Sequence, residues 1–168
     1  YTLGRFGVQL FFIVSGATVF ISYSGIKTKY KNFNQIFFSR RFFRIIPLFI
    51  FISLLEFIFR GESFKNYFSP LAGLYPDSIN SIPGGWSIWN EIYFYLFFPI
   101  YFKIRNNIKL VIILSLICCL VSIMINNRLL PLGDFSLNDW NNFDYLNIFT
   151  QFITFVAGAE FFGKKYKN

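Results

Sequence analysis

The sequence predicts an all-α fold, a polytopic transmembrane helical bundle with about five spans. Hydrophobic residues make up 55% of the 168 residues, and the mean hydropathy is positive. The apolar residues form long continuous runs, which is typical of membrane helices and not of the alternating strands of an outer-membrane barrel. The net charge of +8 comes from Lys and Arg gathered between these runs, where cytoplasmic loops are expected. We therefore expect the lipid bilayer as a partner, and no nucleic acid.

Five apolar runs supply the predicted spans, at residues 6–23, 45–59, 86–102, 110–125 and 148–162. Small residues, among them Ser15 and Gly16, interrupt the first run and predict a face on which another helix packs closely. Pro47 stands near the start of the second run, where a helix tolerates proline best. The fourth run is the plainest, with Leu, Ile and Val throughout.

The segments between the runs alternate in charge. We predict a basic loop at residues 27–44, a mixed loop at 60–83, a basic turn at 103–109 and an acidic loop at 126–147. If the first of these is cytoplasmic, all basic segments lie inside and the acidic loop lies outside. The first residue is then outside and the C-terminus is cytoplasmic. No linker divides the chain, so we expect a single domain over residues 1–168.

Several residue types that often carry catalysis or bind metals give no such signal in this sequence. The chain has no histidine, which removes the usual general base and the commonest metal ligand. Cys118 and Cys119 are adjacent within an apolar run, where we expect them to face lipid or a neighbouring helix. We therefore expect no metal and no permanently bound cofactor. Glu56 lies near the end of its span and can reach water, and we expect Glu160 to extend towards the membrane interface.

The third run carries a carboxylate that a lipid-facing helix would not contain. Glu91 lies six residues into this span, about 9 Å deep at the rise of an α-helix. Helical spacing places Ser87 and Tyr95 on the same face, with Trp86 on a neighbouring one. An ionisable residue at membrane depth is costly unless protein or water receives it, so we predict a functional polar cavity around Glu91. The alternative is an ion pair that only fixes helix packing.

Two arginines, Arg41 and Arg44, are three residues apart at the start of the second run. They share one face if the helix already includes them. Guanidinium groups bind phosphate and pyrophosphate well, which makes this pair a candidate site for a phosphorylated donor. The alternative is that they only set topology, which we favour for Arg40 and the lysines.

These segments together resemble a known family. Residues 7–16 contain Gly-Val, Phe-Phe and Ser-Gly in order, residues 41–47 read Arg-x-x-Arg followed by proline, and residues 86–99 contain Trp-Ser, Glu, Phe-Tyr and Pro. Residues 155–158 add a later Phe-x-x-Gly. In this order the motifs resemble the membrane-bound acyltransferase-3 family, bacterial enzymes that O-acylate cell-surface carbohydrates.

The resemblance implies transfer of an acyl group, usually acetyl, from acetyl-CoA or another acyl-CoA to a sugar hydroxyl of a glycan such as O-antigen or exopolysaccharide. It also implies a multi-pass protein of the inner (cytoplasmic) membrane. The implied residues are Arg41, Arg44, Ser15 and Gly16 for the donor, and Glu91, Tyr95, Trp86 and Ser87 for catalysis. Arg41 and Arg44 would hold the donor's phosphates at the cytoplasmic mouth.

The chain also departs from the family's pattern. The family's first helix carries an Arg and a His, the presumed base, and the family has about ten spans. Ala17 stands where the family usually has Phe or Tyr. We therefore expect this chain to be truncated at both ends and inactive alone, with Glu91 supporting the cavity on the acceptor side, away from the arginine pair. The alternative from another class is a transporter or flippase for a lipid-linked or anionic substrate.

Overall fold

The computed structural model describes residues 2–61, 84–129 and 145–165, with residues 64, 68, 70 and 74. Its helices are α1 (Thr2–Lys29), α2 (Phe33–Arg60), α4 (Gly85–Ile104), α5 (Ile108–Asn126) and α7 (Ile148–Lys165). The described residues contain no strand, and the all-α prediction is confirmed. The predicted loops at 60–83 and 126–147 lie largely outside the described residues.

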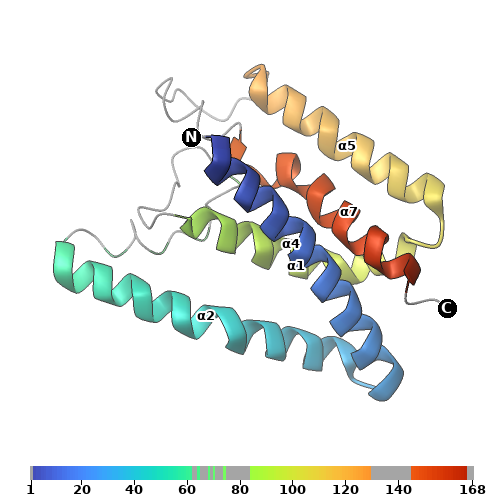
Figure 1. The fold of residues 1–168 in the computed structure, drawn as a ribbon, viewed down its shortest axis with the longest axis horizontal. Helices are drawn as coiled ribbons and strands as arrows, with labels where there is room; N and C mark the ends of the chain where they lie inside the picture. Colours follow the sequence, from blue (N-terminus) through green and yellow to red (C-terminus); the bar gives the residue numbers. More distant parts are fainter. Residues whose placement is uncertain are drawn as a thin grey trace.

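The helices alternate in direction, as Figure 1 shows. Helices α1, α4 and α7 run one way, and α2 and α5 run the other. The α1–α2 turn, the α4–α5 turn and the end of α7 consequently lie at one end of the bundle. Lys29, Lys31, Lys103 and Lys109 stand in or beside these turns, so the basic segments share one end, which we call the basic end.

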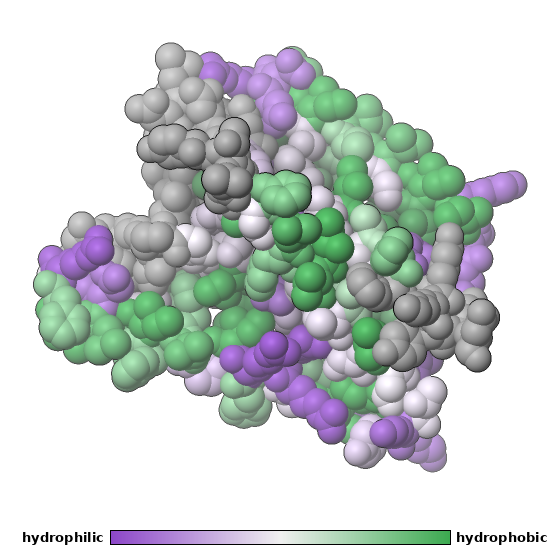
Figure 2. Space-filling view, in the orientation of Figure 1, coloured by the Kyte–Doolittle hydropathy of each residue, from purple (hydrophilic) through white to green (hydrophobic). Residues whose placement is uncertain are grey.

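Three of the helices are long and apolar enough to cross a membrane: Phe6–Lys29 of α1, Phe33–Arg60 and Ile108–Asn126. Helix α7 contributes a shorter apolar stretch, Ile148–Phe161, so the number of five crossings stays a prediction. Apolar side chains cover much of the visible faces of α2 and α5, with a hydrophilic patch midway along α2 (Figure 2). Such wide apolar surfaces are unusual in water and are ordinary against lipid, so this is a membrane protein.

Helix α2 begins much earlier than the sequence predicts. The prediction of a loop at residues 27–44 is wrong at both ends, because α1 continues to Lys29 and α2 begins at Phe33. Phe37 anchors the first turns of α2: it is fully buried, and its ring centroid lies 5.0 Å from that of Tyr23 on α1. Pro47 therefore lies inside the helix and not at its start.

Helices α1 and α7 touch backbone to backbone. A Cβ atom built on Gly16 would lie 2.1 Å from the carbonyl oxygen of Phe155, and one built on Gly158 would lie 2.0 Å from that of Ile13. Only glycine fits at either position. The packing face predicted around Ser15 and Gly16 is confirmed, and α7 is the helix that occupies it.

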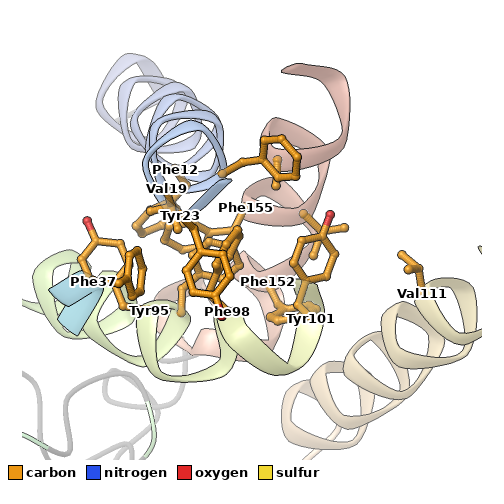
Figure 3. Close-up of a cluster of buried hydrophobic side chains, with 14 of the residues drawn as sticks. Phe12, Val19, Tyr23, Phe37, Tyr95, Phe98, Tyr101, Val111, Phe152 and Phe155 are labelled. Carbon is orange, nitrogen blue, oxygen red and sulfur yellow. The ribbon is translucent and has the colours of Figure 1, made fainter. Parts of the chain in front are cut away.

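Aromatic rings fill the space where α1, α4 and α7 meet (Figure 3). The ring of Phe155 lies 4.2 Å from that of Phe94 and 4.5 Å from that of Phe12, measured between centroids. Helix α5 joins this centre at α7, where the hydroxyls of Ser122 and Thr150 are 2.7 Å apart. Helix α2 joins on the other side, against α1 and α4, and the candidate site lies among those three helices.

Candidate functional site

Glu91 is held by two hydroxyl groups. Ser15 Oγ on α1 donates to Glu91 Oε1 at 2.5 Å, and the hydroxyl of Tyr95, one turn further along α4, donates to the same oxygen. Ser15 and Tyr95 are both buried. Among the described residues, Glu91 Oε2 has no hydrogen-bond partner. The carboxylate is thus fixed through one oxygen and keeps the other for a further donor.

Arg41 completes this cluster from α2. Its side chain is buried, with Nη2 donating to the carbonyl oxygen of Thr18 at 3.2 Å. The guanidinium carbon lies 5.1 Å from the centre of the Tyr95 ring, within the range of a cation–π contact. Arg41 on α2, Tyr95 and Glu91 on α4 and Ser15 on α1 therefore follow one another across three helices. We call Ser15, Arg41, Glu91 and Tyr95 the polar cluster.

Arg44 lies one turn from Arg41 and faces a groove that borders the cluster. The groove has a volume of about 230 Å³, and Arg44 and Glu91 are its charged lining residues. Its remaining walls are apolar and come from Phe11 on α1, Ile88 on α4, and Ile45, Leu48, Phe49 and Ile52 on α2. We call this the α2–α4 groove. It offers one cation and one anion beside an apolar wall.

The structure corrects the predicted separation of Glu91 from the arginines. Arg41 contacts the ring whose hydroxyl binds Glu91, and Arg44 lines the same groove as Glu91. The separation followed from starting the second span at residue 45. Because α2 starts at Phe33, Arg44 lies about 16 Å along the helix, far from its first turn.

Three predicted site residues lie outside both the polar cluster and the α2–α4 groove. Gly16 packs against the backbone of α7, which leaves no room for a ligand at that position. The Trp86 ring packs edge-on against Phe12. Ser87 Oγ donates to the carbonyl oxygen of Gly84 at 2.7 Å, within its own first turn, and so does not reach Glu91.

Sequence reasoning missed a second polar group at the basic end. The hydroxyl of Tyr101 donates to Glu160 Oε1 at 2.5 Å, and Arg105 Nε lies 3.7 Å from the same oxygen. Arg105 also covers the ring of Phe20 at 4.3 Å. Glu160 thus ties α7 to α4, a role that the prediction of an extension towards the interface did not include. The spacing of Tyr101 and Arg105 by one helical turn was the available signal.

The groove wall was also missed, although a pattern could have found it. Arg44, Leu48 and Ile52 follow one another at intervals of four and so lie on one helical face. Within the part of the chain that the structure describes, no three His, Cys, Asp or Glu side chains gather to hold a metal ion.

The comparisons with known proteins identify the family. The family model described as an acyltransferase domain matches residues 1–167. No curated protein and no solved structure matches the chain. The matched range includes Ser15, Arg41, Arg44 and Glu91, the residues that the structure brings to the groove and the polar cluster. The chain belongs to the acyltransferase-3 family of acyltransferase domains, as its motifs predict.

Proposed function

We propose that the protein transfers an acyl group, acetyl or another short one, from acyl-CoA to a hydroxyl group of a cell-surface carbohydrate. Membership of the acyltransferase family supports acyl transfer. The acyl-CoA donor and a glycan acceptor such as O-antigen or exopolysaccharide are our proposal. So is the inner membrane as its location, with the basic end in the cytoplasm, where acyl-CoA is made.

The observation that carries this proposal is the α2–α4 groove, where an apolar wall lies between a guanidinium and a fixed carboxylate. A thioester donor needs an apolar surface for its acyl chain and a cation near its carbonyl oxygen. A hydroxyl acceptor needs an anionic hydrogen-bond acceptor beside the carbonyl carbon. The groove brings all three features, an apolar wall, a guanidinium and a carboxylate, together around one small cavity.

In this proposal Glu91 and Arg44 contact the reacting groups. The free oxygen of Glu91 accepts a hydrogen bond from the sugar hydroxyl and orients it towards the thioester. As the new C–O bond forms and the C–S bond breaks, the hydroxyl proton passes by way of Glu91 to the departing thiolate, which leaves as the CoA thiol. Arg44 stabilises the negative charge that develops on the carbonyl oxygen, and so contacts the donor.

Ser15, Tyr95 and Arg41 are positioning residues in this proposal. Ser15 and Tyr95 hold Glu91 Oε1, and Arg41 holds the ring of Tyr95. Arg41 is only 7% exposed, and its guanidinium already donates to Thr18. We therefore give the donor contact to Arg44 and not to Arg41.

The proposal predicts a specific loss in Arg44→Gln. The full-length gene product, assayed in membranes with labelled acetyl-CoA and a glycan acceptor, should transfer label to the glycan. Arg44→Gln should lower kcat/KM by about 10²–10³-fold, the usual effect of removing one group that stabilises an oxyanion.

Arg60→Gln is the matched control for this experiment. It removes the same charge from the same helix, but Arg60 lies at the far end in an exposed pair with Glu56 at 2.7 Å. Its kcat/KM should remain close to that of the unmodified protein. Absence of any labelled glycan would contradict the proposal, and movement of an anionic substrate across the membrane without acylation would favour a transporter.

A further inference from the structure

A second pocket lies at the corner where α1 ends and α2 begins, outside the α2–α4 groove. Its volume is about 260 Å³, and its polar walls come from both helices and the turn between them: Ser22, Gly25, Lys29, Tyr30 and Arg40. We call it the corner pocket. Its residues took no part in the proposed reaction. Sequence reasoning assigned Arg40 and the lysines only to membrane topology.

The two cations of the corner pocket have no anionic partner in the described part of the chain. Lys29 and Arg40 are both exposed. The carboxylates described are all engaged elsewhere: Glu56 with Arg60, Glu91 with Ser15 and Tyr95, and Glu160 with Tyr101 and Arg105. The pocket therefore concentrates positive charge without neutralising it.

Arg40 and Arg41 are neighbours in the sequence with opposite environments. Arg41 turns into the bundle and is buried against Tyr95. Arg40 turns outward, with its guanidinium carbon 6.0 Å from the centre of the Tyr30 ring, near the limit of a cation–π contact. That contact keeps Arg40 over the pocket, where its remaining donors can reach a ligand.

The chemistry of these walls matches a phosphate group. A guanidinium offers a fork of N–H donors to phosphate oxygens, an ammonium adds a compact positive charge, and the hydroxyl of Ser22 adds a neutral donor. Gly25 is one of the lining residues, and a Cβ built on it would meet no atom within 4 Å, so the space beside it is open. The pocket also opens at the basic end of apolar helices, the level at which lipid headgroups lie.

We propose that the corner pocket, built by Ser22, Gly25, Lys29, Tyr30 and Arg40, binds a phosphate group. The phosphate belongs either to the headgroup of an anionic membrane lipid or to a soluble phosphorylated ligand that approaches from the basic end. The lipid form of the proposal does not depend on acyl transfer, because it concerns residues that line a different cavity. The soluble form, probed with coenzyme A, rests on the proposed acyl-CoA donor.

The experiment measures two kinds of binding by the full-length protein in nanodiscs. In one arm, native mass spectrometry compares retention of phosphatidylglycerol with that of phosphatidylcholine. In the other, calorimetry measures binding of coenzyme A in discs of phosphatidylcholine alone. The variants are Lys29→Gln/Arg40→Gln, which removes both charges, and Gly25→Leu, which keeps the charges and adds a bulky side chain to the pocket wall.

We expect both variants to weaken binding of at least one probe by about tenfold or more, as loss of charge-assisted hydrogen bonds to phosphate implies. A loss for phosphatidylglycerol identifies a lipid headgroup, and a loss for coenzyme A alone identifies a soluble ligand. The matched control is Lys31→Gln/Lys109→Gln, which removes two exposed charges from the basic end outside the pocket. It should bind both probes as the unmodified protein does.

Three results would overturn the proposal. The first is unchanged binding of both probes in Lys29→Gln/Arg40→Gln. The second is an equal loss in the control pair, because the effect would then come from diffuse surface charge. The third is full binding in Gly25→Leu, because a leucine side chain in the pocket wall should obstruct a ligand that lies in the pocket.

Discussion

Replacing Glu91 with glutamine is expected to lower kcat for acyl transfer by about 10²–10⁴-fold, the usual contribution of a group that positions and accepts a reacting proton. The glutamine side chain keeps the shape of the glutamate and can still accept hydrogen bonds from Ser15 and Tyr95. It loses the negative charge and the second acceptor oxygen, which in our proposal receives the sugar hydroxyl. KM for acyl-CoA should change little, because Glu91 is not assigned to the donor. Initial rates with labelled acetyl-CoA measure both constants.

Glu56→Gln is the matched control for this substitution. Glu56 is also a glutamate within an apolar helix, but it pairs with Arg60 on the exposed surface of α2. Its kcat should equal that of the unmodified protein. If Glu91→Gln kept a kcat close to the unmodified value, Glu91 would be a structural residue, and the assignment of the acceptor site would be wrong.

The second large effect is expected at the crossing of α1 and α7. In Gly158→Ala, the new methyl group must displace the Ile13 carbonyl oxygen, from which its Cβ would lie only 2.0 Å away. We expect the free energy of unfolding to fall by about 1–3 kcal/mol, the usual cost of overpacking, or by more if the helices cannot separate. Thermal unfolding in detergent, followed by circular dichroism, measures the change.

Gly7→Ala is expected to change the free energy of unfolding in the opposite direction. Gly7 lies on α1 as well, and a Cβ built there meets no atom within 4 Å. Alanine favours a helix over glycine by about 0.5–1 kcal/mol, so this variant should be as stable as the unmodified protein or more so. Equal thermal stability of Gly158→Ala and Gly7→Ala would show that the backbones of α1 and α7 do not touch.

The helices could be predicted because membrane helices carry their signal in local composition. Each apolar run corresponds to a helix of the structure, and the Gly16 packing face was visible as a break of small residues. The start of α2 was missed for a physical reason. Arginines and lysines suggested a loop between residues 27 and 44, whereas Phe37 buries itself against Tyr23 and Arg41, one turn later on the same face, is buried with it.

Within the candidate site, only contacts between residues of the same helix could be predicted from the sequence. Tyr95 follows Glu91 by one turn, so their contact follows from spacing alone. The contact of Ser15 with Glu91 joins residues of two helices, and no local pattern determines which helix face meets which. The same holds for Arg41 and Arg44, of which one is buried and the other faces the groove, although their sequence environments are similar.

Photolabelling tests the central claim, that the α2–α4 groove receives the acyl chain of the donor. Another cavity, of the same volume of about 230 Å³, lies among α4, α5 and α7 and is lined by Phe97, Leu114, Ile117 and other apolar residues. Volume alone therefore does not show which of the two cavities receives the acyl chain. An acyl-CoA analogue with a diazirine on its acyl chain, activated by light in membranes, marks the residues that surround the chain. We expect label on residues 45–52 of α2 and on Ile88 of α4, and its loss when unlabelled acetyl-CoA competes. Label confined to Phe97, Leu114 and Ile117 would contradict the claim.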